Sequence, residues 1–274
     1  MGTDWHVNRD GGWQNYWKSK NSSEISSEVS SDTAFYTSVQ CIEITDDGRK
    51  QVDVDVAIEN SFKLNVNSTH ITTFLTSPRE LEELAAGFLL CEGFVTSPDD
   101  IISMKIGDNS ISCEIMDKLQ QVGQQEQYAN IKHINSAALN VCFETKVIFS
   151  AIEQLKVRAK SWRRTGGTHL SMVCNSGGEV LVFCEDVSRA CSVDKTVGKA
   201  MLSGIDLSKC VLVTTGRLSV TMIAKAARAG FPLIASKAAP LSEGIRLADE
   251  VGMTLVAFAR KPDLYVYTGA HRVI

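Results

Sequence analysis

The stretch between Thr165 and Gly198 constrains the fold most, because it combines a glycine turn, two apolar runs and a helix start. A Gly-Gly turn leads into His169, and apolar runs at Leu170–Cys174 and Val180–Cys184 flank an Asn-Ser-Gly-Gly turn. Two strands joined by a glycine turn predict a β-hairpin. The hairpin continues into a helix, which indicates an α/β unit.

Ionisable side chains gather where the second strand of this hairpin passes into the helix. They are Glu185, Asp186, Arg189, Asp194 and Lys195. A ligand site is common at such strand ends, although a capped helix with surface ion pairs accounts for the same residues. A hairpin brings the start of its first strand beside the end of its second. We therefore expect His169, Asp186, Arg189 and Lys195 to converge at one cleft, with a carboxylate raising the pKa of His169; a structural, hydrogen-bonded histidine is the alternative.

Composition limits the function classes. The chain has 274 residues, of which 44% are hydrophobic, and this supports one large or two modest domains. The net charge of -4 gives no electrostatic case for nucleic acid or an anionic membrane. No window approaches the roughly 18 apolar residues of a spanning helix, and no signal-peptide core is visible, so we expect a cytoplasmic protein. Its eight cysteines are expected to be reduced, and the lack of a Cys-x-x-Cys pair removes the commonest zinc sites.

The first half of the chain predicts a tail and a small domain. Residues 1–40 are rich in Ser and Glu and predict a mobile tail. A small α+β domain is expected over 41–119. Its predicted strands are Val52–Ile58, Phe62–Val66, Ile71–Thr76, Met104–Ile106 and Ile111–Ile115. Its helix is expected to start with a capping box, in which Ser77 is the N-cap and Glu80 is at N3.

The second half predicts a linker with a cysteine loop over 120–145 and an α/β domain over 146–274. A helix is expected to bury Ile148, Ile152, Leu155, Ala159 and Trp162 on one face. It also carries five cations without an acid, namely Lys156, Arg158, Lys160, Arg163 and Arg164. A solvated face is one interpretation of this run, and an anion site is the other. Strands and helices then alternate to the C-terminus, which predicts a mixed sheet with helices on both faces.

Several catalytic classes lack their motifs. A zinc deaminase needs His-x-Glu and Pro-Cys-x-x-Cys, and neither is present. The Walker phosphate loop and the Gly-x-Ser-x-Gly elbow of serine hydrolases are also missing. Glycine turns at helix starts remain, and these bind anions through backbone N–H groups.

Five long segments resemble the FdhD/NarQ family of formate dehydrogenase accessory sulfurtransferases. They are SPRELEELAAGFLLCEGF at 77–94, GGTH at 166–169, EDVSRACSVDKTVG at 185–198, TGRLSVTMIAKAARAG at 215–230 and FARKPDLYVYTGAHRV at 258–273. The resemblance implies a three-layer α/β/α, cytidine-deaminase-like domain without zinc. It also implies a sulfur carrier that moves sulfur from a cysteine desulfurase to the molybdenum bis(molybdopterin guanine dinucleotide) cofactor of formate dehydrogenase. We expect a homodimer with no nucleic-acid or membrane partner.

The resemblance implies that the cofactor contacts the loop after a C-terminal strand. This loop comprises Phe258, Ala259, Arg260, Lys261, Pro262 and Asp263. Arg260 and Lys261 suit a pyrophosphate or a guanine nucleotide, and a solvated turn is the alternative. His169, Asp186, Arg189, Lys195 and Arg217 are the other expected cofactor contacts.

Cys142 is the expected sulfur-accepting residue. The family commonly has Cys-x-x-Cys before the Gly-Gly turn, whereas here only Cys142 is present, with Leu139 three residues earlier. We expect the downstream cations to favour its thiolate, and a buried core cysteine is the alternative. Cys191 is the rival, because it lies near a helix start beside Arg189. Three functions remain open: a sulfur carrier, a cofactor-binding chaperone without transfer chemistry, and a protein-interaction scaffold.

Overall fold

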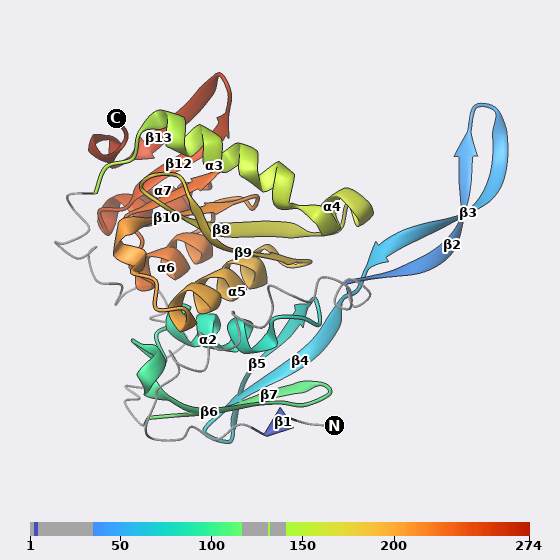
Figure 1. The fold of residues 1–274 in the computed structure, drawn as a ribbon, viewed down its shortest axis with the longest axis horizontal. Helices are drawn as coiled ribbons and strands as arrows, with labels where there is room; N and C mark the ends of the chain where they lie inside the picture. The colour runs from blue at the N-terminus through green and yellow to red at the C-terminus, as the bar shows by residue number, and fades with distance from the viewer. Residues whose placement is uncertain (1–2, 5–34, 117–130, 132–140) are drawn as a thin grey trace.

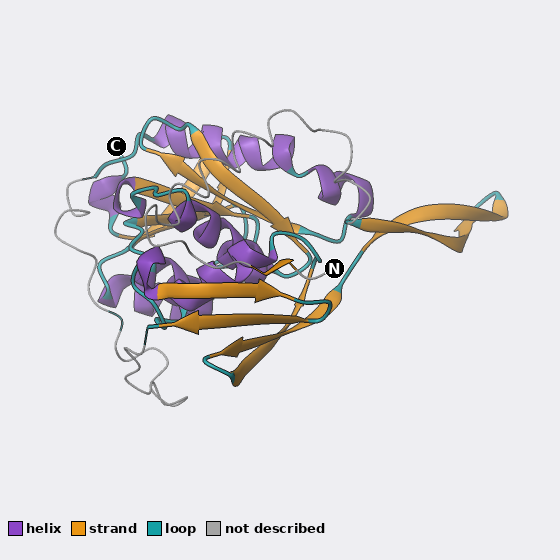
Figure 2. Ribbon diagram, turned by 60° about the horizontal axis from the view of Figure 1, so that its bottom comes forward, coloured by secondary structure: helices purple, strands orange, loops and turns teal. Residues whose placement is uncertain are grey.

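The computed structural model describes residues 3–4, 35–116, 131 and 141–274. Two sheets enclose a layer of helices, and one further helix covers the outer face of the larger sheet (Figures 1 and 2). None of the helices in these residues is long and apolar enough to cross a membrane.

The smaller sheet has the strand order β1-β6-β7-β4-β5. Its elements are β1 (Thr3–Asp4), β4 (Asn60–Val66), β5 (Thr69–Thr76), β6 (Ile101–Ile106) and β7 (Ser110–Ile115), with helix α2 (Leu81–Cys91) and a 3-10 turn (Pro98–Asp100). The predicted strands at 62–66, 71–76, 104–106 and 111–115 are confirmed.

The predicted capping box is wrong, although the helix is present. Helix α2 begins at Leu81, and its N-cap is Glu80 in a left-handed conformation with φ 52° and no side-chain cap. The hydroxyl of Ser77 instead accepts a hydrogen bond from the backbone N–H of Val187 at 3.2 Å. Glu80 pairs with Lys199 at 3.0 Å. Both side chains are therefore used for contacts with the larger domain.

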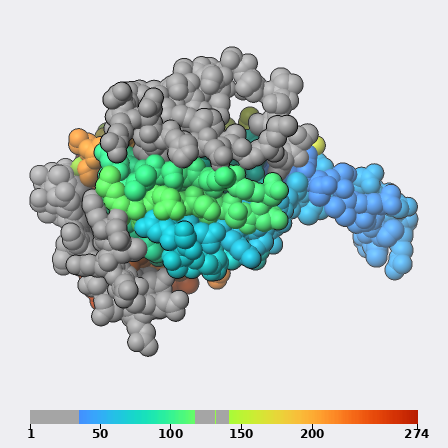
Figure 3. Space-filling model, turned by 90° about the horizontal axis from the view of Figure 1, so that it is seen from below, coloured from blue at the N-terminus to red at the C-terminus, as the bar shows by residue number. Residues whose placement is uncertain are grey.

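A two-stranded hairpin projects from the body of the molecule (Figures 1 and 3). Its strands are β2 (Tyr36–Thr45) and β3 (Gly48–Ala57). Strand β2 starts within residues 1–40, so the last part of the predicted tail is ordered, and the rest lies outside the described residues apart from β1. Val39 pairs with Val54 on the hairpin, and both side chains are exposed. The predicted strand from Val52 thus belongs to this hairpin.

The larger sheet has the strand order β13-β12-β11-β10-β8-β9. Its strands are β8 (His169–Asn175), β9 (Val180–Asp186), β10 (Cys210–Thr214), β11 (Leu233–Ser236), β12 (Thr254–Arg260) and β13 (Asp263–Thr268). Strands β10, β11 and β12 are parallel, whereas β8 runs antiparallel to β10 and β9, and β13 antiparallel to β12. The predicted hairpin and the α/β class are confirmed.

Helices cover both faces of this sheet. They are α3 (Thr145–Arg158), α4 (Lys160–Thr165), α5 (Arg189–Leu202), α6 (Val220–Arg228) and α7 (Ser242–Glu250), with 3-10 turns at Leu207–Lys209 and Ala270–Arg272. Side chains of α3 pack on one face, and those of α5, α6 and α7 belong to the core on the other. The single helix predicted through Trp162 is wrong. It breaks at Ala159, whose φ and ψ are -71° and 67°, and Trp162 is 48% exposed.

Helices α2 and α5 pack so closely that their backbones are in contact, and this contact joins the smaller and larger units of the molecule. A Cβ atom added to Gly87 would lie 1.7 Å from the carbonyl oxygen of Asp194, and one added to Gly198 would lie 1.9 Å from that of Glu83. One hydrophobic core runs from Leu64 and Leu84 through Val193 to the larger sheet. The small α+β unit is therefore packed onto the α/β unit through a shared core.

Candidate functional site

A groove lies where the carboxyl ends of β10, β11 and β12 meet the end of α3. It consists of two cavities of about 480 and 620 Å³, which share Lys156, Thr215 and Lys237. Thr215 follows β10, and Lys237 follows β11. This is the edge at which open α/β sheets bind ligands, and the volumes are those of small-molecule sites.

The groove contains more cations than acids, because its described lining includes one carboxylate, Glu153, which pairs with Lys261. Lys156, Lys237 and Arg260 line it, and none of them pairs with a carboxylate of the described residues. Burial lowers the pKa of Lys237 below its ordinary value, and the charges of Lys156 and Arg260 lower it further. Like charges held together in this way destabilise one another until an anion binds. The donor set therefore fits a phosphate or pyrophosphate group.

The predicted cofactor loop contributes to the groove unevenly. Ala259, Arg260 and Lys261 line the larger cavity, and Lys261 pairs with Glu153 at 3.0 Å. Phe258 and Asp263 line a shallow depression of about 420 Å³ with two exposed tyrosines. Pro262 is exposed at the turn. The predicted loop is shorter than expected, because β12 extends to Arg260 and β13 begins at Asp263; only Lys261 and Pro262 form the turn, at the end of a strand as predicted.

His169 lies between the groove and a separate cavity of about 310 Å³, called here the helix-start cavity. Its Nδ1 atom is 3.1 Å from the hydroxyl of Thr215. Burial lowers the pKa of His169, the charges of Arg189 and Lys237 act in the same direction, and Asp186 opposes them with a smaller effect. The predicted rise of this pKa is therefore wrong, because burial and the two cations outweigh the carboxylate.

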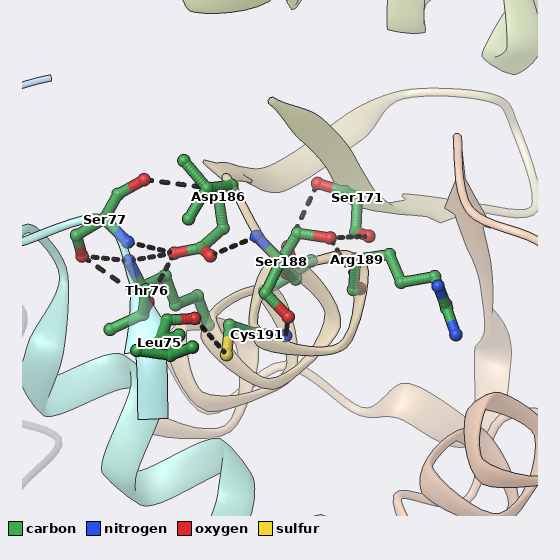
Figure 4. A network of polar contacts seen from close by, with 12 residues as sticks. Leu75, Thr76, Ser77, Ser171, Asp186, Ser188, Arg189 and Cys191 are labelled. Carbon is green, nitrogen blue, oxygen red and sulfur yellow. Dashed lines mark hydrogen bonds and ion pairs between the residues drawn. The ribbon is translucent and has the colours of Figure 1, made fainter. Parts of the chain in front are cut away.

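Asp186 is next to His169 in the hairpin register, as predicted, but its carboxylate is engaged elsewhere. It pairs with Lys195 at 2.6 Å, and both side chains are fully buried. Figure 4 shows the same carboxylate with the hydroxyl of Thr76 and the backbone N–H of Ser77, at 2.6 and 3.1 Å. Lys195 donates to the carbonyl of Ser77 at 2.9 Å. Asp186 and Lys195 thus connect the two parts of the fold.

The helix-start cavity lies between the starts of α5 and α6. Arg189 and His169 line it with Ser188 and Ser219, the N-cap residues of the two helices. The side chain of Arg189 points away from Asp186 (Figure 4). Of the four residues predicted to share one cleft, His169 and Arg189 do so, whereas Asp186 and Lys195 are sealed from solvent. Arg217 is exposed and lies outside both cavities of the groove. No cluster of His, Cys, Asp and Glu among the described residues could hold a metal ion.

The cysteines differ sharply in exposure. Cys142 and Cys41 are exposed, and the other six are buried. Burial raises the pKa of the Cys191 thiol to about 12, so the predicted activation by the helix start is outweighed by desolvation. Burial likewise raises the pKa of the thiols of Cys91, Cys113, Cys174, Cys184 and Cys210. The exposed position predicted for Cys142 is confirmed.

Cys142 lies at the opposite end of the sheet from the groove. The next residue, Phe143, donates its N–H to the carbonyl of Arg272, and Arg272 in turn bonds Thr254, the first residue of β12. Strand β12 spans roughly 20 Å at about 3.3 Å per residue. The predicted field from the cations of α3 and α4 therefore does not reach Cys142, because the helix runs away from it.

The sequence does not predict Lys237 and Trp162 as binding residues, and it offers Lys156 only as part of the basic run. Lys237 follows a strand directly, so the strand-end rule that selected Arg260 applies to it equally. Lys156 belongs to the basic run of the helix, for which the sequence leaves both an anion site and a solvated face open. The sequence places Trp162 on a buried helix face, whereas in the structure it follows the break at Ala159 and lines the groove.

Comparisons with known proteins agree with one another. A family model described as the FdhD/NarQ family matches residues 57–274. The sulfur carrier protein FdhD of Methanothermobacter thermautotrophicus is 34% identical over 88% of this chain and 100% of its own length. That of Listeria monocytogenes is 28% identical, over 82% of this chain and 93% of its own length.

A crystal structure of a putative formate dehydrogenase accessory protein from Desulfotalea psychrophila shares the fold. It has a TM-score of 0.75 and 29% identity, covering 88% of this chain and all of that one. The family model's match to residues 57–274 includes the β8–β9 hairpin, the groove and the buried pair of Asp186 on β9 and Lys195 on α5. The chain therefore belongs to the FdhD/NarQ family.

Proposed function

We propose that this protein is a sulfur carrier that supports formate dehydrogenase. Its cargo is the molybdenum bis(molybdopterin guanine dinucleotide) cofactor, which it binds while sulfur from a cysteine desulfurase is delivered. The names of its relatives, sulfur carrier protein and formate dehydrogenase accessory protein, support this role.

The observation that carries the proposal is the cationic groove. Lys156, Lys237 and Arg260 surround cavities large enough for a nucleotide, and their charges lack partners among the described carboxylates. A guanine dinucleotide offers a pyrophosphate, which matches such a donor set. In this role His169 stays neutral near pH 7 because its pKa is lowered, and it offers its ring beside Thr215 to the bound ligand.

Cys142 is the proposed carrier of the sulfur. Its thiolate attacks the outer sulfur of a persulfide on the desulfurase; a new S–S bond forms, the old one breaks, and the desulfurase cysteine leaves as a thiolate. Exposure of Cys142 suits contact with another protein. Sulfur on Cys142 must then cover the length of β12 to reach the groove, through movement of the cysteine segment or from another subunit.

A cofactor-binding chaperone without sulfur transfer is the second candidate. The distance from Cys142 to the groove and the missing Cys-x-x-Cys pair favour it. Mass spectrometry after incubation with a desulfurase and cysteine separates the two. The sulfur carrier predicts a gain of one sulfur atom on Cys142, lost in Cys142→Ser and kept in the exposed-cysteine control Cys41→Ser. An unmodified Cys142 would leave the chaperone function.

The same proposal includes a cytoplasmic homodimer. The hairpin of β2 and β3 supports the dimer, because an isolated two-stranded hairpin is marginally stable in water. Its exposed Val39, Val54 and Val56 offer an apolar surface that a second copy would cover. Light scattering of the wild type and of Val39→Lys with Val54→Lys tests it, with a dimer expected for the former and a monomer for the latter.

A further inference from the structure

Glu185, on strand β9, accepts hydrogen bonds from the start of helix α4. Its two carboxylate oxygens accept hydrogen bonds from the backbone N–H groups of Ser161 and Trp162, at 2.9 and 3.0 Å. The hydroxyl of Thr168 donates to the same carboxylate at 3.1 Å. Glu185 is buried, with 8% of its surface exposed. A carboxylate placed in this way satisfies helix N–H groups that have no partner within the helix.

Helix α4 is short and would not hold its place alone. It has six residues, no side-chain cap and no buried residue of its own. A helix of this length is unstable in water without tertiary contacts. Two further contacts hold its other side: Arg164 pairs with Asp55 of the hairpin at 2.5 Å and stacks on Tyr36 at 3.8 Å. Glu185 and the hairpin therefore fix where α4 lies.

The position of α4 decides where Trp162 lies. The indole lines the smaller groove cavity with Lys237, whose ammonium is 5.5 Å from the ring centre. Trp162 is 48% exposed. A half-exposed aromatic ring near a cation that pairs with no carboxylate of the described residues offers two kinds of contact: stacking for a planar ring and attraction for an anion.

We propose that Trp162 is the ring-stacking residue of the groove and that Glu185 positions it. The ligand class is a planar heterocycle attached to a phosphate or pyrophosphate, with the ring against Trp162 and the anion near Lys237 and Arg260. This inference rests on the proposed function, because it assumes that the groove holds the cargo. It adds the two residues that distinguish a nucleotide from a bare anion.

Binding of GDP and of inorganic pyrophosphate to the full chain tests the assignment. Trp162→Ala is expected to weaken GDP binding roughly tenfold, the size of one lost stacking contact, and to leave pyrophosphate binding unchanged. Trp162→Phe keeps a ring and is expected to retain most of the GDP affinity. Lys237→Met is expected to weaken both ligands.

A second measurement isolates the positioning role of Glu185. Glu185→Gln replaces one acceptor oxygen by an amide that cannot accept from the helix, so GDP binding should weaken several-fold. In the Trp162→Ala background the same change should have no further effect, because residues that act as a unit are not additive. Glu179→Gln, in the exposed turn of the same hairpin, is the matched control.

The outcomes separate the two proposals. Unchanged GDP affinity in Trp162→Ala, with weakened binding in Lys237→Met, overturns the stacking assignment and leaves the proposed cargo groove intact. If Glu185→Gln weakens GDP binding equally in the wild type and in the Trp162→Ala background, the positioning role of Glu185 is overturned. Failure of the wild type to bind either ligand contradicts the proposed function itself.

Discussion

The carboxylate of Asp186 lies 2.6 Å from the ammonium of Lys195, and neither side chain is exposed to solvent. The pair also bonds Thr76 and Ser77 of the smaller unit. Loss of one partner leaves a buried charge without compensation, which typically costs about 3–5 kcal/mol. Asp186→Asn and Lys195→Met are each expected to lower the free energy of unfolding by about that amount, measured by urea denaturation.

The exposed pair of Arg246 and Glu243 provides the control. Arg246→Met should leave the free energy of unfolding nearly unchanged, since surface pairs contribute little. An effect of Lys195→Met as small as that of Arg246→Met would show that the buried pair does not hold the two units together.

The contact between α2 and α5 predicts a strict requirement for glycine. Gly87→Ala and Gly198→Ala would each place a methyl group inside the backbone of the facing helix. The helices must separate, at a cost of about 3 kcal/mol or more. The midpoint temperature of thermal unfolding should decrease strongly in both variants. It should decrease only slightly in Gly177→Ala, where the added atom meets only the side chain of Asn175 at 3.3 Å.

His169 makes stability depend on pH. Its pKa in the folded protein is below the ordinary 6.5, chiefly because of burial. As the pH falls below 6.5, the unfolded chain takes up a proton that the folded protein does not, so stability decreases. His169→Gln should flatten this part of the curve when urea unfolding is followed between pH 7 and pH 5. An identical slope in the variant would show that His169 is not the group responsible.

Thiol accessibility predicts which cysteines react. Alkylation of the native protein with iodoacetamide, followed by peptide mapping, should label Cys142 and Cys41 first. Cys191 should react slowly, because its thiol is buried with a pKa of about 12. Fast labelling of Cys191 would restore it as the rival sulfur acceptor.

Local patterns predicted much of the fold. The glycine turn after Cys174 and the apolar runs on either side were sufficient for the β8–β9 hairpin. The capping box failed because the side chain of Ser77 bonds Val187, just before α5, and that of Glu80 pairs with Lys199 of α5, both far away in the sequence. No glycine or proline marks the helix break at Ala159 in the sequence. The contacts of α4 with Glu185 and Asp55 join residues far apart in the chain, so a local pattern does not predict them.

The candidate site was predicted in part for the same reason. The position of Arg260 at the end of a strand follows from the alternation of strands and helices. The register of His169 with Asp186 also follows, but register does not decide which groups an Asp186 carboxylate binds. Its partner Lys195 faces the smaller unit, and packing between units is not visible in a linear pattern. The large separation of Cys142 from the groove depends on the direction of α3 and β12.

The central claim is that the cationic groove binds a guanine nucleotide, and titration calorimetry with GDP tests it most directly. The account predicts saturable binding by the wild type that weakens as salt is added, and at least about tenfold weaker binding in the Arg260→Ala, Lys261→Ala double variant and in Lys237→Met. It predicts unchanged binding in Arg246→Ala, because Arg246 lies on α7 and lines neither groove cavity. GDP affinity that is the same in all of these variants would contradict it.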